Sequence, residues 1–320
     1  MMDQAIRDFA KQFSWNPKIE NSGKLKRHKK FIVAGMGGSN HATDLIKIWN
    51  PQLDITVHRD YGLPRAISRE HLVIASSYSG NTEEAVDALE QALKNKFFCA
   101  VIAVGGKLLM QAKKYKIPYV QIPDTGIQPR SALGFSFKGL LKLMGDNKGL
   151  AEVRQLGQLL KPSAQEQAGK ALAQSLKNTV PVIYSSVQNQ ALANIWKITL
   201  NETGKIPAFY NVFPELNHNE MNGFDRVPAS QHLSQGFSFV MFKDKNDHPR
   251  VQKRMRVLEQ LYIKRGLPVK VVSLKGKDWL TKTFSAVILG GWTAFYTAEM
   301  YGLDSEQVPM VEEFKSLIAK

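Results

Sequence analysis

The sequence is poor in the features that mark secreted, metal-bound and membrane-embedded proteins. Cys99 is the one cysteine among 320 residues, which excludes an internal disulfide and any site built from several cysteine ligands. No apolar run approaches the roughly 20 residues that a membrane span needs. The N-terminal segment carries Asp3 and Asp8, where a signal peptide would be apolar. We therefore expect a cytoplasmic protein without a membrane partner.

Acidic residues are also scarce. The chain has 28 Asp and Glu against 43 Lys and Arg, a formal net charge of +15. A basic surface attracts nucleic acid, anionic lipid or small phosphorylated molecules. The only dense basic run is Lys24–Lys30, and no helix-turn-helix, zinc-finger or RNA-recognition signature is present. We expect no nucleic-acid partner; a solvated basic surface is the simpler interpretation, and steering of an anionic substrate stays open.

Short apolar runs alternate with helical patterns along most of the chain. The runs Phe31–Ala34, Leu72–Ala75 and Phe98–Val104 are typical of buried strands. Such alternation favours a parallel sheet covered by helices on both faces. Residues 145–165 lack a strand pattern and contain three glycines and Pro162. We place a domain boundary there, which predicts two α/β domains, residues 1–150 and 151–320, each with three layers.

A glycine-rich turn, Gly35-Met36-Gly37-Gly38-Ser39, lies between a predicted strand and a predicted helix. Glycines there let backbone N–H groups approach an anion, and the helix N-terminus adds partial positive charge. A dinucleotide fingerprint would need glycine at position 40, where the chain has Asn40. No Gly-Lys-Ser/Thr ending of a nucleotide-binding P-loop occurs either. Nucleotide binding is disfavoured, and a tight turn without a ligand remains an alternative from this motif alone.

A second polar turn, Ser76–Glu84, also lies between a strand and a helix. Its hydroxyls and its glycine can bind a phosphate through neutral hydrogen bonds and the helix dipole. Asn81 with Glu84 has the pattern of a helix cap. Because the carboxyl ends of parallel strands meet at one edge of a sheet, both turns would line one crevice there. The sequence therefore predicts a phosphate-binding site.

Four segments together resemble one known family: GMGGS at 35–39, SSYSGNTEE at 76–84, QPRSALG at 128–134 and PAFYNVFPELNHNE at 207–220. They are similar to the bifunctional phosphoglucose/phosphomannose isomerases of the sugar isomerase (SIS) superfamily, in the same order along the chain. The resemblance implies two SIS-type domains and a homodimer. It also implies reversible conversion of glucose 6-phosphate, with mannose 6-phosphate as a second aldose, to fructose 6-phosphate, with no cofactor or metal.

The resemblance also implies site residues. The phosphate would be held by Gly37, Gly38, Ser39, Ser77, Ser79 and Thr82. Glu202 would move the proton between C1 and C2, which suits a carboxylate that can take up and return the same proton. Arg130 would stabilise the enediolate. His218, contributed by the neighbouring subunit, and Lys315 would open the sugar ring. Without the resemblance, Glu202, Arg130 and Lys315 have the pattern of ordinary surface residues.

Two alternatives stay open at this point. SIS domains also occur in phosphosugar sensors without catalytic activity, and a basic nucleic-acid-binding protein is a weaker possibility. One departure from the family concerns Asn40 and His41, since the family has glycine after GMGGS. Asparagine tolerates the left-handed conformation, so we expect the turn to survive, and His41 could add a proton-dependent contact near the phosphate.

Overall fold

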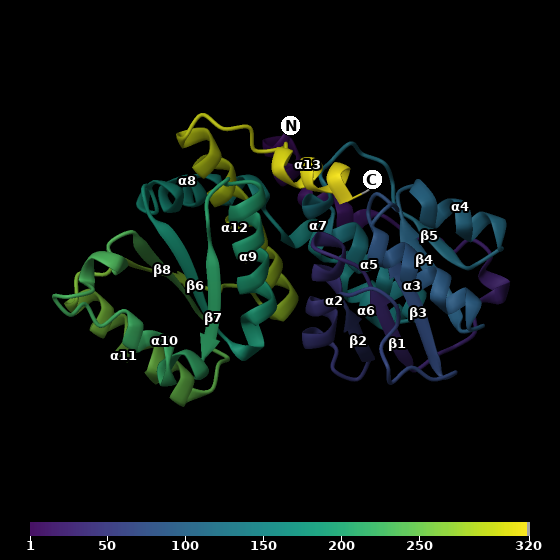
Figure 1. The fold of residues 1–320 in the computed structure, drawn as a ribbon, viewed down its shortest axis with the longest axis horizontal. Helices are drawn as coiled ribbons and strands as arrows, with labels where there is room; N and C mark the ends of the chain where they lie inside the picture. Colours follow the sequence, from purple (N-terminus) through teal and green to yellow (C-terminus); the bar gives the residue numbers. More distant parts are fainter. Residues whose placement is uncertain (319–320) are drawn as a thin grey trace. The chain divides into compact units, whose positions relative to one another are not determined.

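The computed structural model describes residues 1–318. The chain divides into two compact units, residues 7–160 and residues 1–6 with 161–320. Each unit contains a parallel sheet flanked by helices (Figure 1), which confirms the predicted α/β class. None of the helices within residues 1–318 has the length and apolarity to cross a lipid bilayer.

The unit of residues 7–160 contains a five-stranded parallel sheet in the order β2-β1-β3-β4-β5. Its strands are β1 (Lys30–Ala34), β2 (Asp54–His58), β3 (His71–Ser76), β4 (Phe98–Ala103) and β5 (Tyr119–Gln121). β1 and β3 are buried along almost their whole length, because helices cover both faces of the sheet. The chain crosses from β2, at one edge, past β1 to β3, so the strand order changes direction between β1 and β3.

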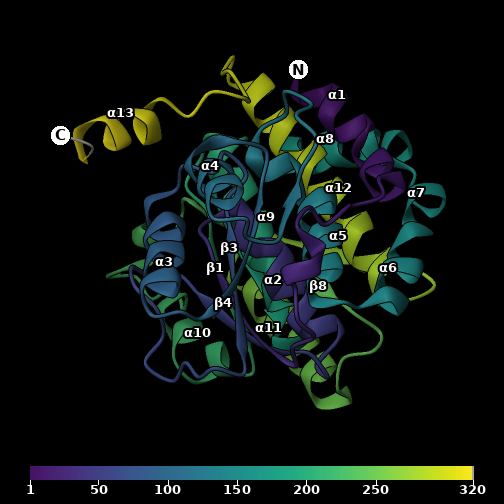
Figure 2. The ribbon, with the colours of Figure 1, turned by 90° about the vertical axis from the view of Figure 1, so that its right-hand side faces the viewer.

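Helices cover this sheet on both sides. They are α2 (Gly38–Trp49), α3 (Glu83–Lys94), α4 (Gly106–Lys114) and α5 (Leu133–Met144). The next two helices, α6 (Asn147–Arg154) and α7 (Leu156–Leu159), pack outside this layer, α6 against α5. Figure 2 shows α3 on one side of β1, β3 and β4, with α2 and α5 on the other. Gly139 of α5 lets that helix lie directly on the sheet, since a Cβ there would come within 2.3 Å of the Ile102 side chain.

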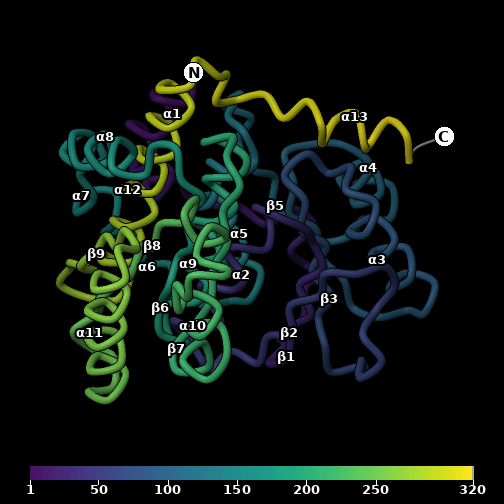
Figure 3. The backbone as a smooth tube through the Cα atoms, turned by 60° about the vertical axis from the view of Figure 1, so that its left-hand side comes forward, coloured from purple at the N-terminus to yellow at the C-terminus, as the bar shows by residue number. Residues whose placement is uncertain are grey.

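The second unit contains a four-stranded parallel sheet in the order β7-β6-β8-β9. Its strands are β6 (Val180–Ser186), β7 (Phe209–Phe213), β8 (Phe237–Lys243) and β9 (Val269–Ser273). Its helices are α8 (Glu166–Ser175), α9 (Gln190–Glu202), α10 (Glu220–Gly223), α11 (Pro249–Lys264), α12 (Trp279–Met300) and α13 (Pro309–Ile318), while α1 (Met2–Arg7) begins the chain. Figure 3 traces the chain from α12 into α13.

Successive side chains of the central strand β6 belong to two separate hydrophobic cores in this unit. Ile183 of β6 belongs to the cluster that contains Trp196 of α9 and Ala294 of α12. The next residue, Tyr184, belongs to the opposite cluster with Leu258 of α11. Successive side chains of a strand point to opposite faces, so α9 and α12 cover one face and α11 covers the other.

Residues 145–165 contain no strand, as expected; they form α6, α7 and the 3-10 helix η4 (Pro162–Gln165), and α8 follows. The Asp146 carboxylate caps α6 by accepting from the Gly149 backbone N–H at 2.8 Å. Two of the three glycines, Gly149 and Gly157, serve close packing. A Cβ on Gly149 would lie 2.9 Å from the Trp49 ring, and one on Gly157 would lie 2.9 Å from the Ser14 hydroxyl.

Candidate functional site

The turn after β1 is shaped by glycines that no other residue replaces without strain. Gly37 has φ +48° and precedes α2. A Cβ on Gly35 would lie 2.4 Å from the Ser76 carbonyl oxygen, and one on Gly38 would lie 3.2 Å from the Arg130 Cα. The backbones of three loops therefore meet here, at the carboxyl ends of β1 and β3. This is the point where the strand order changes direction, which is where open α/β sheets bind ligands.

Hydroxyl groups join the two predicted phosphate-binding turns to each other. The Tyr78 backbone N–H donates to Ser39 Oγ at 3.0 Å, and Ser76 Oγ donates to the Ser39 carbonyl at 3.2 Å. Ser77 Oγ lies 2.8 Å from Thr82 Oγ1 and accepts from the Gly80 N–H at 3.1 Å. These bonds hold the turns in one conformation before any ligand arrives.

Exposure separates the predicted phosphate-binding hydroxyls into two pairs. Ser39 and Ser77 are buried at 8% and 2% relative exposure, so their hydroxyls hold the turns together. Ser79 is exposed and Thr82 is half-buried, so these two hydroxyls are accessible to an incoming anion. A hydroxyl rotates its proton toward either partner, which lets Thr82 serve both Ser77 and a phosphate oxygen.

Asn81 does not cap the following helix, contrary to the sequence-based expectation. The N-cap residue of α3 is Thr82, whereas Asn81 Oδ1 accepts from the Lys107 backbone N–H of α4 at 3.0 Å. The turn packs against the start of α4 so tightly that a Cβ on Gly80 would lie 1.9 Å from the Gly105 carbonyl oxygen. The amide is needed to join two turns, which a local sequence pattern does not reveal.

Asn40 and His41 lie in the first turn of α2, so Asn40 is helical rather than left-handed, and the strained position belongs to Gly37. Asn40 is fully buried and donates to the carbonyl oxygens of Gly35 and His58. His41 is 5% exposed, and neither of its ring nitrogens has a hydrogen-bond partner among residues 1–318. Burial, together with the nearby charge of Arg59, lowers the pKa of His41 to about 4.

The buried imidazole makes the stability of this unit depend on pH. Between pH 4 and 6.5 the unfolded chain binds a proton that folded His41 does not, so the free energy of unfolding falls as the pH is lowered. A shift of this size corresponds to about 3 kcal/mol. Between pH 7 and pH 4 the free energy of unfolding, measured by chemical denaturation, should therefore fall by about 3 kcal/mol less in His41→Leu than in the wild type. Parallel pH profiles of the two proteins would contradict this assignment.

Arg130, the predicted enediolate-stabilising residue, lies in the short 3-10 helix η3 (Pro129–Ser131). Its backbone contacts the Gly38 position of the first turn, and its side chain is half-buried. The structure therefore brings Arg130 and the predicted phosphate-binding residues together at one edge of one sheet.

Three predicted catalytic residues belong to residues 161–318. Glu202 is the last residue of α9 and is half-buried. His218 ends the 3-10 helix η6 (Glu215–His218) after β7 and is exposed. Lys315 is exposed on α13 and pairs with Glu312 at 2.8 Å. The two side chains are 60% and 62% exposed, so the Glu312 carboxylate binds the Lys315 ammonium group only weakly.

Lys205 connects the end of α9 to the segment that precedes α13. Its ammonium group donates to the Glu202 carbonyl oxygen at 2.5 Å and also to the Gln307 carbonyl oxygen. Lys205 has φ +59°, a conformation that few non-glycine residues adopt. The backbone of the predicted proton-transferring residue is thus held by a side chain that also holds the C-terminal segment.

In the second sheet, a pair of charged side chains lies at the carboxyl end of β8. The Lys282 ammonium of α12 pairs with the Asp244 carboxylate after β8, and both side chains are at most 5% exposed. The Asn189 amide donates to the same carboxylate at 3.2 Å. Burial acts to raise the pKa of Asp244, but the bonds from Lys282, the Asn246 N–H and Asn189 lower it overall. Serines and glycines follow the carboxyl ends of β1 and β3 in the first sheet, whereas a buried ion pair lies after β8 in the second sheet.

Comparison with known proteins extends over the whole chain. The family described as "Bacterial phospho-glucose isomerase C-terminal SIS domain" matches residues 165–318. A bifunctional phosphoglucose/phosphomannose isomerase of Caldicellulosiruptor bescii is 33% identical over 335 residues, covering 99% of this chain and 96% of that protein. Another protein of that name, from Aquifex aeolicus, is 30% identical over 323 residues, covering 99% and 98%.

A solved structure is similar to the whole chain as well. The tagatose-6-phosphate ketose/aldose isomerase from Escherichia coli matches with a TM-score of 0.68, covering 96% of this chain and 95% of that chain. At 15% sequence identity this likeness establishes the shared fold.

Proposed function

Because the chain belongs to the bifunctional phosphoglucose/phosphomannose isomerase family, we propose that it interconverts glucose 6-phosphate and mannose 6-phosphate with fructose 6-phosphate. It is an aldose–ketose isomerase of phosphorylated sugars. The observation that carries the proposal is full-length similarity to these isomerases, combined with two interlocked hydroxyl- and glycine-rich turns at the switch point of the first sheet. A sensor without catalytic activity is not favoured.

The phosphate is held mainly by neutral groups. Residues 76–84 contain no basic side chain, so the accessible hydroxyls of Ser79 and Thr82 donate to phosphate oxygens. The N-termini of α2 and α3 add partial positive charge. Ser39, Ser77 and the glycines at 37 and 38 keep the turns in the binding conformation. Such an anchor fixes one end of the sugar and leaves its other end for the chemistry.

The reaction requires ring opening and then proton transfer between C1 and C2. We assign ring opening to His218 and Lys315, since imidazole and ammonium groups can exchange a proton with the ring oxygen. Glu202 removes the proton from one carbon and returns it to the other. Arg130 offsets the charge that develops on the enediolate, as a fixed guanidinium does in a water-poor site. All four assignments follow the family resemblance.

The active form in this proposal is a homodimer in which His218 of one subunit completes the site of the other. The exposure of His218 in the single chain is compatible with that arrangement. The single cysteine favours a cytoplasmic location. No metal or cofactor is assigned a step, because protein charges can supply the stabilisation that the enediolate needs.

The proposal is tested by incubating the protein with each aldose phosphate and following fructose 6-phosphate formation, with and without a chelator. We expect conversion of both aldoses and equal rates with chelator present. Activity lost with the chelator and restored by a metal would overturn the assignment of the chemistry to side chains. Tight phosphosugar binding without turnover would instead favour the sensor.

A further inference from the structure

The Glu220 carboxylate, two residues after His218, is held by two side chains of the second sheet. Tyr184 of β6 donates its hydroxyl to Glu220 Oε1 at 2.5 Å. Asn211 of β7 donates its amide Nδ2 to Glu220 Oε2 at 2.5 Å. Both carboxylate oxygens are thus bonded from two adjacent strands, β6 and β7.

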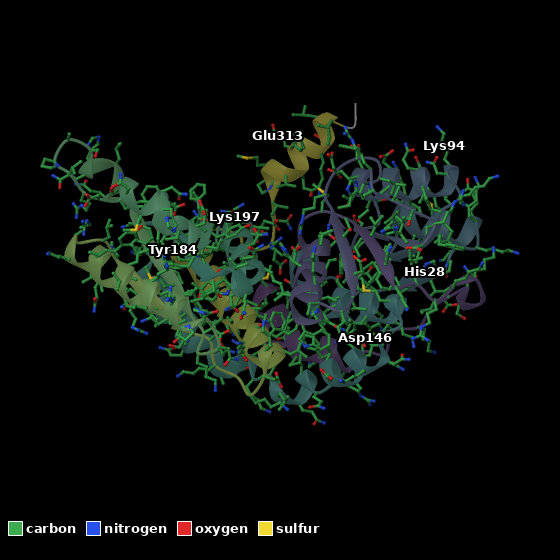
Figure 4. The ribbon with its side chains drawn as sticks, turned by 90° about the horizontal axis from the view of Figure 1, so that it is seen from below. His28, Lys94, Asp146, Tyr184, Lys197 and Glu313 are labelled. Carbon is green, nitrogen blue, oxygen red and sulfur yellow. The ribbon has the colours of Figure 1, made fainter. Side chains whose placement is uncertain are left out.

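Tyr184 is itself held rigidly. Tyr184, which is labelled in Figure 4, is completely buried. Its ring packs against Phe213, Phe239 and Tyr262 with centroid separations of 6.0, 5.3 and 6.4 Å. Burial, the neighbouring Tyr262 and Glu220 all raise the pKa of the Tyr184 hydroxyl far above its ordinary value. The hydroxyl therefore keeps its proton, so Tyr184 is always the donor and Glu220 the acceptor.

The amide of Asn211 also has a fixed orientation. Its Oδ1 accepts from the Val212 backbone N–H at 2.7 Å, so its Nδ2 is the atom that faces the Glu220 carboxylate. Two donors of fixed direction therefore meet one two-oxygen acceptor. Hydrogen bonds to a charged acceptor are among the stronger ones in proteins.

Glu220 is coupled in turn to the segment that carries His218. The Glu220 backbone N–H donates to Asn219 Oδ1 at 2.6 Å, and Asn219 Nδ2 donates to Glu215 Oε1 at 2.8 Å. The His218 ring has no hydrogen-bond partner of its own within residues 1–318. Its position therefore depends on the segment 215–220, which is attached to the sheet through the buried Leu216 side chain and through the hydrogen bonds of Glu220.

We propose that Tyr184 and Asn211 are positioning residues, which act through Glu220 to hold His218 where it can open the sugar ring. The inference rests on the proposed function, because that function assigns ring opening to His218. Tyr184 and Asn211 do not touch the substrate in this account. Their loss should slow ring opening more than it affects binding of a molecule that needs no ring opening.

The test compares Tyr184→Phe with Tyr262→Phe. Both residues are buried and keep their rings, and their hydroxyls lie 3.4 Å apart, but only the Tyr184 hydroxyl is bonded to Glu220. We expect Tyr184→Phe to lower kcat for glucose 6-phosphate about tenfold, since small misplacement of a reacting group is costly. The enzyme-catalysed exchange between the anomers, followed by NMR, should slow equally, because it requires ring opening alone.

Binding and a second variant separate positioning from general damage. The inhibition constant of an open-chain phosphorylated sugar acid should stay within twofold for Tyr184→Phe. Tyr262→Phe loses only the 3.4 Å bond to the Tyr184 hydroxyl and should slow anomer exchange much less than Tyr184→Phe does. Asn211→Ala, at a half-buried position of the edge strand β7, should reproduce the slowed anomer exchange if Tyr184→Phe folds poorly. When Glu220 is already replaced by glutamine, adding Tyr184→Phe should lower the rate of anomer exchange by less than a further twofold.

The outcomes distinguish this inference from the proposed function. Wild-type protein that interconverts none of the three phosphosugars would overturn both. An active wild type, with anomer exchange unchanged in Tyr184→Phe and Asn211→Ala, would overturn the positioning role alone. Equal losses of kcat and inhibitor binding in Tyr184→Phe and Tyr262→Phe would also overturn it, because they would indicate a role in core packing.

Discussion

Replacing Glu202 with glutamine is expected to lower kcat for the conversion of glucose 6-phosphate by about 10²- to 10⁴-fold, the usual contribution of a positioned general base. Glutamine keeps the size and hydrogen bonding of the side chain but cannot take up the proton from C1 or C2. The proposed phosphate anchor lies in residues 7–160 and is unchanged by this substitution. Binding of an open-chain phosphorylated sugar acid, measured by calorimetry, should therefore stay within a few-fold of the wild type.

A matched control is available in the same unit. Glu299 is also in the last turn of a long helix, α12, and it is exposed. Glu299→Gln should leave kcat and KM unchanged. Should Glu202→Gln retain turnover near the wild-type rate, the proton transfer must be reassigned to another residue. A loss of inhibitor binding as large as the loss of kcat would point to a distorted fold rather than a missing base.

Replacing Lys282 with methionine is expected to lower the free energy of unfolding of its unit by about 3 to 5 kcal/mol. The substitution leaves the Asp244 carboxylate buried without its cation, and removing one partner of a buried ion pair carries this cost. Lys315→Met provides the comparison, because its pair with Glu312 is 60% and 62% exposed. Such exposed pairs contribute about 0 to 1 kcal/mol. Both variants are measured by denaturant unfolding, following the transition of the second unit.

A double variant identifies the cause of the loss. Asp244→Asn combined with Lys282→Met removes both charges, and we expect it to recover much of the lost stability, since the cost comes from the unpaired charge. The ion-pair explanation would be contradicted if the double variant had a lower free energy of unfolding than Lys282→Met alone. Loss of stability would then be due to packing around α12.

The strands and the two polar turns after β1 and β3 could be predicted from the sequence because their signals are local. β3 contains the continuous apolar run Leu72–Ala75, as expected for a parallel strand covered on both faces, and polar turns follow both β1 and β3. The helices α6 and α7 could not be predicted, because glycine lowers helix propensity. Gly149 and Gly157 are there because of their tertiary contacts.

The polar contacts within the second unit lay beyond sequence analysis for a related reason. Tyr184 and Glu220 are 36 residues apart, and Asp244 and Lys282 are 38 apart. Hydrophobic periodicity describes faces of single elements and carries no information about which polar side chains meet across a sheet. Tyr184 in VPVIYSS has the pattern of an ordinary core residue of a strand.

The double attachment of Lys205 would give the C-terminal segment an influence on the proton transfer that we propose for Glu202. One ammonium group bridges the backbone of Glu202 and that of Gln307, only two residues before α13 starts. Any event that pulls the chain terminus away, whether a fusion tag, a truncation or a clipping protease, removes one anchor of that bridge. In engineering this molecule, additions are therefore better joined at sites far from its carboxyl tail.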